Sequence, residues 1–198
     1  YQDTIFSSIY TNVYQNKKIK GYDRAFNLIE CILNVEDMRL GGCFVEVGVA
    51  AGHSSVIAAL TFSKYIQRSF YLYDTFRGFI DVPNEKDINN KSLQEYDLSN
   101  YSSNDCSVNS VRKRMLSAGI DENNIFLIEG RAQDTVKHIR PSSISILRLD
   151  SDLYEPTLVS LEQLYDLLEL NGYLIVDHYG HWKGSQKAVD KKKKKRNI

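Results

Sequence analysis

The chain has 198 residues, with 25 lysines and arginines against 25 aspartates and glutamates, so its formal net charge is zero. This length suits one α/β domain and is too short for two ordinary ones. The balanced charge indicates no nucleic-acid partner, and no apolar run approaches the ~20 residues that span a bilayer. Three widely spaced cysteines, Cys31, Cys43 and Cys106, favour neither a disulfide framework nor a zinc site. We expect a reduced, cytoplasmic protein without a signal peptide.

Apolar segments alternate regularly along most of the chain. Residues Tyr1 to Met38 carry apolar side chains at helical spacing, and Gly41-Gly42 ends that pattern. The strands and helices that follow are typical of an α/β doubly wound fold, a mostly parallel sheet with helices on both faces. In chain order, the predicted elements are the strand Cys43 to Val47, the helix Ser54 to Thr61, the strand Ser69 to Tyr73, the helix Val108 to Ala118, the strand Ile125 to Glu129, the helix Ala132 to Ile139, the strand Ile144 to Leu149, the helix Leu158 to Leu170 closed by Asn171-Gly172, and the strand Tyr173 to Val176.

Two polar stretches fall outside this alternation. Residues Arg77 to Asp105 are rich in Asn, Asp, Ser and Lys, and loops of this length are usually functional lids or disordered segments. We expect a lid there. The lysine-rich tail from Lys187 to Arg196 indicates a solvated helix end or a loose terminus, because no aromatic residues are interleaved as in many nucleic-acid sites.

The conspicuous polar residues gather at the predicted strand ends. A doubly wound sheet binds ligands at the carboxyl ends of its strands, near the point where strand order reverses. The segments at these ends are Glu46 to Gly52, Asp74, Gly130, Asp150 to Asp152 and Asp177-His178. We therefore expect a single site along this rim.

The loop after the first strand predicts a nucleoside cofactor. Gly48 and Gly52 allow close approach of the backbone to a ligand at the start of a helix. A dinucleotide loop would more often read Gly-x-Gly-x-x-Gly, and an acidic Glu46 suits the ammonium and sulfonium of S-adenosylmethionine better than a pyrophosphate. A plain tight turn is the alternative. Asp74 is placed to accept hydrogen bonds from a ribose diol, or else to cap a helix.

Acidic residues follow the last two predicted strands. If these strands are neighbours, their tips lie about 5 Å apart, and Asp150, Asp177 and His178 would converge on one cation. Clustered carboxylates repel one another unless a cation or proton relieves them. The alternative is that they cap helices or pair with Arg148 and Lys183.

A divalent cation at this place would lower the pKa of an acceptor hydroxyl and orient its oxygen. Asp152 lies on the same loop as Asp150 and is the predicted general base. His178 and His181 are the alternatives for this role, although a lone histidine is more often a packing or surface residue.

Around these residues the chain resembles the macrocin O-methyltransferase family, the metal-dependent sugar methyltransferases of macrolide and aminocoumarin biosynthesis. The similarity runs from about Gly21 to Asp190. Four ordered blocks carry it: Phe44-Val45-Glu46-Val47-Gly48-Val49, Tyr73-Asp74-Thr75-Phe76-Arg77-Gly78-Phe79, Leu147-Arg148-Leu149-Asp150-Ser151-Asp152-Leu153-Tyr154-Glu155 and Gly172-Tyr173-Leu174-Ile175-Val176-Asp177-His178-Tyr179.

The resemblance implies a class I methyltransferase (Rossmann-like) fold, S-adenosylmethionine as methyl donor and a magnesium-like ion. It implies Asp150, Asp177 and His178 as metal ligands and Asp152 as base, with His178 as a second catalytic candidate. The residues expected to contact the cofactor are Glu46, Gly48, Gly52, Ser54, Asp74, Thr75, Gly130 and Asp150.

This chain departs from the family pattern at three places. His178 stands where the family usually has a second aspartate, which favours a softer ion such as manganese over magnesium. Ala50-Ala51-Gly52-His53 replaces the usual Arg-Gly-Gly of the cofactor loop. The antiparallel strand pair that normally ends this fold has no counterpart after the last predicted strand, so we expect a fragment or the ordered part of a longer protein.

We therefore predict one methyltransferase domain over residues 1–198, with N-terminal helices in 1–40 and a lid in 77–105. It would methylate a hydroxyl of a sugar or glycosylated small molecule, using S-adenosylmethionine and magnesium or manganese. We expect no nucleic-acid or membrane partner, and the N-terminal helices would suit a homo-oligomer interface. A non-catalytic module and a dinucleotide-binding module on the same fold are the alternatives.

Overall fold

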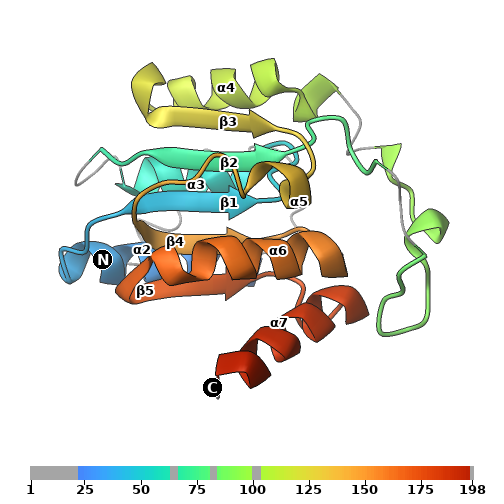
Figure 1. The fold of residues 1–198 in the computed structure, drawn as a ribbon. Helices are drawn as coiled ribbons and strands as arrows, with labels where there is room; N and C mark the ends of the chain where they lie inside the picture. Colours follow the sequence, from blue (N-terminus) through green and yellow to red (C-terminus); the bar gives the residue numbers. More distant parts are fainter. Residues whose placement is uncertain (1–21, 63–66, 81–83, 100–103, 197–198) are drawn as a thin grey trace.

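Five parallel strands form one sheet in the order β3-β2-β1-β4-β5 (Figure 1). The structure is a computed structural model that describes residues 22–62, 67–80, 84–99 and 104–196. The strands are β1 Cys43–Val47, β2 Phe70–Asp74, β3 Ile125–Glu129, β4 Ile144–Leu149 and β5 Leu168–Val176. Strand order reverses between β1 and β4, which is where doubly wound sheets bind ligands. The predicted fold class is confirmed.

Helices cover both faces of this sheet (Figure 1). They are α2 Tyr22–Asp37, α3 His53–Phe62, α4 Val108–Ser117, α5 Ala132–Thr135, α6 Tyr154–Leu164 and α7 Lys183–Arg196. Residues of α2, α3 and α4 share one core with Phe44, whereas residues of α5, α6 and α7 share the other with Val45. Because successive strand residues point to opposite faces, a strand buried on both faces reads as one apolar run.

The boundary between α6 and β5 differs from the prediction. The leucine spacing predicted a helix over Leu158 to Leu170, but α6 begins at Tyr154 and ends at Leu164, and β5 begins at Leu168. The ladder to β4 decides this, since Leu168 pairs with Ile144 and, after a register shift, Tyr173 pairs with Ile146. Strand pairing overrides local helix preference here.

The remaining predicted elements need smaller adjustments. The α-helix predicted over Ala132 to Ile139 is limited to Ala132–Thr135, and the lysine-rich tail lies in α7. The predicted N-terminal helices are represented by α2, and the part before residue 22 lies outside the described residues. All three cysteines are free thiols. None of the described helices is long and apolar enough to cross a membrane.

A buried arginine joins the end of α2 to the start of β1. Arg68 donates from Nε to Glu36 Oε1 at 2.8 Å, and from its terminal nitrogens to the carbonyls of Gly42 and Leu40 at 2.8 and 2.6 Å. The side chains of Arg68 and Glu36 are only 5% and 4% exposed. Both buried charges in this connection therefore have partners.

Replacing Arg68 with alanine should lower the free energy of unfolding by about 3–5 kcal/mol, because Glu36 would stay buried without its partner. Arg112→Ala is the matched control, since Arg112 pairs with Glu122 at the surface and exposed pairs contribute about 0–1 kcal/mol. Urea unfolding followed by circular dichroism measures both variants. Equal losses of unfolding free energy in the two variants would show that the buried Arg68–Glu36 pair contributes no more than a surface pair.

Candidate active site

A pocket of about 550 Å³ opens at the carboxyl ends of the strands. Loops that follow all five strands contribute to its wall, as expected for a sheet whose strand order reverses at its centre. The predicted site residues that line it are Gly48, Asp74, Thr75, Gly130, Asp150, Asp152 and His178. The predicted residues outside this lining are Glu46, Gly52, Ser54 and Asp177.

The loop after β1 approaches the loop after β4 through a glycine. Gly48 has a φ of +89°, and a Cβ there would lie 2.6 Å from the carbonyl carbon of Asp150. The chain continues through Ala50, which also has a positive φ of 48°. Only a residue without a side chain fits the first position, and the backbone of the loop therefore faces the pocket directly.

Asp74 lines the pocket and also fixes the loop after β1. Its Oδ2 accepts hydrogen bonds from the backbone N–H groups of Val49 and Ala50 at 2.6 and 2.9 Å. Its Oδ1 accepts another from Phe76 at 2.8 Å. One carboxylate thus fixes two neighbouring loops, and a carboxylate retains further acceptor capacity for a ligand hydroxyl.

Glu46 does not face the pocket, which corrects the expectation that its carboxylate contacts the cofactor. The residue has no exposed surface. Its carboxylate accepts hydrogen bonds from Ser54 at 2.5 Å and from Ser55, and it pairs with Arg148. Burial raises the pKa of Glu46 despite these partners. Ser54 is engaged in the same contact, and Gly52 faces Val111 instead of the pocket.

Arg148 is buried at the centre of a charge network. One terminal nitrogen contacts Glu46, and the other lies 3.0 Å from Asp150 Oδ2 and 2.6 Å from Asp177 Oδ2. Arg24 on α2 reaches the same oxygen of Asp177 at 2.9 Å. Three carboxylates therefore share two guanidinium groups, and Asp152 on the Asp150 loop contacts the His178 ring instead. Carboxylates gathered this closely repel one another unless cationic groups lie between them.

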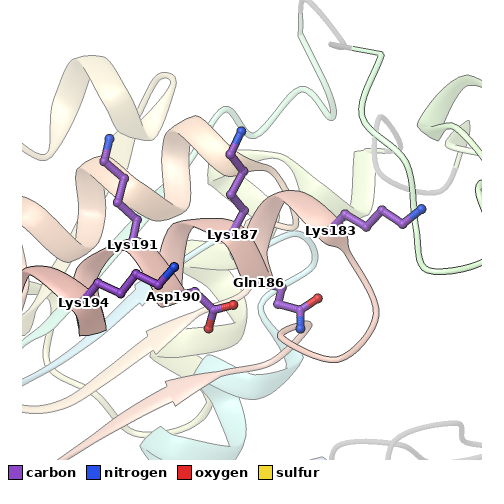
Figure 2. A pocket seen from close by; sticks show the side chains of 6 residues that line it. All are labelled: Lys183, Gln186, Lys187, Asp190, Lys191 and Lys194. Carbon is purple, nitrogen blue, oxygen red and sulfur yellow. The ribbon is translucent and has the colours of Figure 1, made fainter. Parts of the chain in front are cut away.

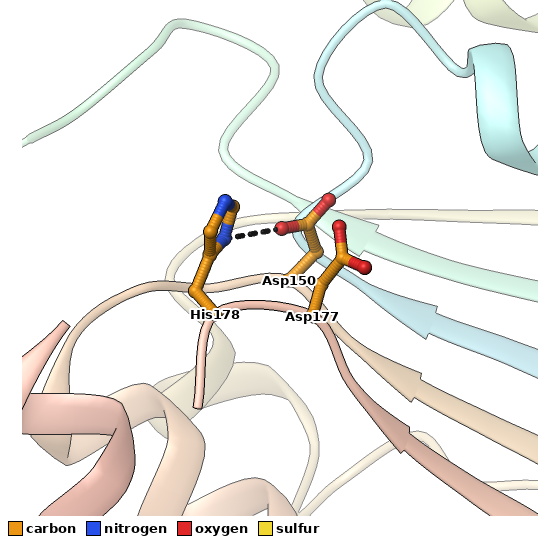
Figure 3. Close-up of side chains that lie close together, drawn as sticks. All are labelled: Asp150, Asp177 and His178. Atoms are coloured by element: carbon orange, nitrogen blue, oxygen red, sulfur yellow. Dashed lines mark ion pairs between the residues drawn. The ribbon is translucent and has the colours of Figure 1, made fainter. Parts of the chain in front are cut away.

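Three side chains at the tips of β4 and β5 point toward one another (Figure 3). Asp150, Asp177 and His178 each offer a ligand atom, and these atoms lie within 4.8 Å of one another. His178 Nδ1 lies 2.8 Å from Asp150 Oδ1 and contacts Asp152 Oδ1. Neither contact has hydrogen-bond geometry, so these three buried atoms have no hydrogen-bond partner among the described residues. Buried polar atoms in this state fit a bound cation.

The titration of this cluster reflects burial and neighbouring charge. Burial of the His178 ring would lower its pKa, but Asp150 and Asp152 outweigh that effect and raise it to about 10. Burial also opposes ionisation of Asp150, yet Arg148 and His178 lower the pKa of its carboxyl. Burial raises the pKa of Asp152. The imidazole is therefore protonated at neutral pH and must lose that proton to bind a metal.

Arg24 and Glu85 are among the pocket residues that sequence reasoning missed. Arg24 contacts Asp177 and lies 3.3 Å from His178 Nε2, across more than 150 positions of sequence. Glu85 lies on the pocket wall within the polar stretch expected to form a lid. A single arginine on a helix and one acid in a polar loop carry no local motif. Only the folded arrangement identifies them.

A second hollow lies along α7 and is separate from the strand ends (Figure 2). It measures about 580 Å³ and is lined by one face of this helix, namely Lys183, Gln186, Lys187, Asp190, Lys191 and Lys194. The ring of Tyr154 lies 5.0 and 5.9 Å from the ammonium groups of Lys187 and Lys191. The lysines of the tail thus line one face of α7. The tail itself contains no aromatic residue, and Tyr154 of α6 supplies the aromatic ring beside these lysines.

The fold and the pocket at its strand ends define a class I methyltransferase. More particularly, the chain matches the macrocin-O-methyltransferase (TylF) family over residues 15–198 and belongs to that family. The resemblance deduced from the four sequence blocks is confirmed.

Two curated relatives illustrate this membership. The chain is 26% identical over 180 residues to the demethyldecarbamoylnovobiocin O-methyltransferase of Streptomyces niveus, covering 90% of this chain and 68% of the relative. It is 22% identical over 161 residues to the mycinamicin III 3''-O-methyltransferase of Micromonospora griseorubida, covering 80% and 63%. The chain thus spans about two thirds of the length of the curated relatives it matches.

Solved structures share the fold. The O-methyltransferase NovP superposes with a TM-score of 0.81 at 23% identity, covering 100% of this chain and 91% of NovP. The calicheamicin methyltransferase CalS11 superposes with a TM-score of 0.71 at 19% identity, covering 96% and 83%.

Gly48→Ala should destabilise the protein more than Gly119→Ala. Both glycines have φ near +89°, but a Cβ at Gly119 meets nothing within 4 Å, whereas a Cβ at Gly48 collides with Asp150. The control should lose about 1–2 kcal/mol from left-handed strain alone, and Gly48→Ala should lose clearly more. Urea midpoints measure the difference, and equal midpoints would show that the two loops separate freely.

Proposed function

We propose that this protein transfers a methyl group from S-adenosylmethionine to a hydroxyl of a sugar or glycosylated small molecule, assisted by a divalent cation. The observation that carries this proposal is the convergence of Asp150, Asp177 and His178, whose ligand atoms lie within 4.8 Å of one another beside the pocket. The family supports the reaction, and the cluster supports the cation.

The part of the pocket formed by the loops after β1, β2 and β3 suits a nucleoside. Gly48 and Gly130 present backbone without side chains, and Asp74 offers carboxylate oxygens between them. These features match what a ribose diol and its base require, namely hydrogen-bond acceptors and close backbone approach. The absence of a Gly-x-Gly-x-x-Gly loop argues against a dinucleotide.

The part of the site at the ends of β4 and β5 suits a divalent cation held by Asp150, Asp177 and His178. Carboxylates favour magnesium or manganese, and the imidazole shifts the preference toward manganese. Such an ion lowers the pKa of an acceptor hydroxyl and orients its oxygen. Arg148 and Arg24 hold the Asp177 carboxylate in place and limit the excess negative charge.

Asp152 is the residue best placed to receive the proton. The acceptor oxygen forms a bond to the methyl carbon while the carbon–sulfur bond breaks, leaving S-adenosylhomocysteine, and the hydroxyl proton passes to the Asp152 carboxylate. Asp152 lines the pocket and has a φ of 61°, which turns the chain sharply after β4. His178 contacts the Asp152 carboxylate and so lies beside the proposed base. Methyl transfer is a direct displacement, so this positioning contributes much of the rate.

The relatives support the proposed acceptor class. Their names specify glycosylated natural products, including a rhamnosyl tetracenomycin in Streptomyces olivaceus. The pocket lining also includes the apolar side chains of Phe79, Ile80 and Leu153 and the carboxylates of Glu85 and Glu155. Apolar surface next to hydrogen-bond acceptors suits a deoxysugar.

Removing the cation should abolish methyl transfer. Treatment with EDTA, or the substitution Asp177→Ala, should eliminate transfer of labelled methyl from S-adenosylmethionine to rhamnosides, because the hydroxyl would no longer be activated. Calorimetry should show that S-adenosylhomocysteine still binds and that NAD does not. Added manganese should restore the EDTA-treated enzyme and leave Asp177→Ala inactive. Full activity in EDTA would exclude a role for metal.

Asp152→Asn should reduce transfer by about 10²–10⁴-fold, the usual contribution of a general base. Asparagine tolerates the left-handed backbone at this position, so manganese and S-adenosylhomocysteine should bind as in the wild type. Single-turnover rates measure the loss. A rate within twofold of the wild type, roughly the reproducibility of such an assay, would assign the proton to another group, His178 being the next candidate.

A further inference from the structure

Residues 84–99, here called the lid segment, touch both loops that carry the candidate metal ligands. One loop follows β4 and contains Asp150 and Asp152, and the other follows β5 and contains Asp177 and His178. The two loops follow neighbouring strands and are joined by the backbone bond from Asp177 to the Leu149 carbonyl and by side-chain contacts. The lid segment adds a carboxylate contact at the end of the first loop and a backbone pairing with the second.

The first contact is made by Glu85 at the start of α6. Its two carboxylate oxygens accept hydrogen bonds from the backbone N–H of Tyr154 at 3.1 and 3.0 Å. Tyr154 is the first residue of α6 and lies two positions after Asp152. Gly184 provides the space, because a Cβ there would collide with the Glu85 carboxylate. A carboxylate at a helix N-terminus stabilises the helix, because it accepts a hydrogen bond from a backbone N–H that has no partner within the helix.

The second contact is a short backbone pairing. Ile88 donates to the carbonyl of His181 at 3.0 Å, and Lys183 donates to that of Lys86 at 3.3 Å. His181 and Trp182 in turn donate to the carbonyl of His178 at 3.0 Å each, which closes the turn that begins at this candidate ligand.

A buried carboxylate stabilises the lid side of this pairing. Asp87 is 1% exposed and accepts hydrogen bonds from Asn89, Lys91 and the hydroxyl of Tyr96, the last at 2.6 Å. The Tyr96 ring lies 5.5 Å from that of Trp182. The lid segment is therefore a folded unit that binds the β5 loop on one side and α6 on the other.

We infer that Glu85 is a positioning residue of the metal site: with the lid pairing, it fixes the separation between the loop of Asp150 and Asp152 and the loop of Asp177 and His178. This inference rests on the proposed function, because it assumes that these loops hold a cation. Metal ligands are effective only when outer contacts hold them in register, and loss of such contacts typically weakens metal binding 10–100-fold.

Manganese binding to the whole chain tests this directly, followed by the electron paramagnetic resonance signal of free Mn²⁺. Glu85→Ala should weaken Mn²⁺ binding about tenfold. Gly184→Ala should weaken it similarly by expelling the intact Glu85 carboxylate from Tyr154. A Cβ at Gly184 would also lie 2.7 Å from the backbone nitrogen of Tyr154, so the melting temperature of Gly184→Ala should fall as well. Glu85→Gln keeps an amide oxygen as acceptor and should bind Mn²⁺ nearly as well as the wild type.

Glu95→Ala is the matched control. Glu95 is also a lid carboxylate, but among the described residues its hydrogen bonds come only from Ser92 in the lid itself, and its loss should leave Mn²⁺ affinity unchanged. Wild-type affinity in Glu85→Ala, or in Gly184→Ala alone, would overturn the inference. No Mn²⁺ binding by the wild type would instead overturn the proposed metal site, and the inference with it. S-adenosylhomocysteine binding in every variant verifies that the pocket is intact.

Discussion

The buried guanidinium of Arg148 is the interaction on which the site depends. It joins carboxylates that belong to three adjacent strands: Glu46 within β1, Asp150 after β4 and Asp177 after β5. Without a shared cation, these acids would repel one another in a buried position. Burial alone would lower the pKa of Arg148, but its three partners outweigh that effect and raise it, so its charge is permanent.

The rim of the sheet has two sides, which are held in place by different kinds of contact. On the side of β1 and β2, hydrogen bonds from the backbone to Asp74 hold the glycine-containing loop. On the side of β4 and β5, the charges around Arg148 hold the acidic loops. The two sides meet where Gly48 passes the Asp150 carbonyl. A nucleoside on one side and a cation on the other would thus lie against one continuous backbone surface.

Much of the fold could be predicted from the sequence because it is encoded locally. Strands buried on both faces read as apolar runs, and the acids that follow them mark the rim; β1, β3 and β4 form at the predicted residues. The start of β5 could not be predicted, since Leu168 has helical spacing and adopts a strand only because Ile144 is its neighbour.

The site was predictable in its outline and not in its contacts. The expected residues Asp150, Asp152 and His178 do lie together, because they follow β4 and β5, and the ends of neighbouring strands lie close to each other. Glu46 was expected at the cofactor, but it lies on the face of β1 that α3 covers, where Ser55 and Arg148 hold its carboxylate. The roles of Arg24 and Glu85 depend on long-range contacts that have no periodicity or motif in the sequence.

The lysines of α7 place like charges along one helix face. Lys183, Lys187 and Lys191 recur at four-residue intervals, a spacing at which like charges destabilise a helix. Salt at physiological strength screens charges beyond about 8 Å. It therefore weakens this repulsion as well as the attraction within surface ion pairs. Gly184, the second residue of the same helix, lies beside Glu85 on the pocket wall, so the helix that carries this charge also borders the pocket.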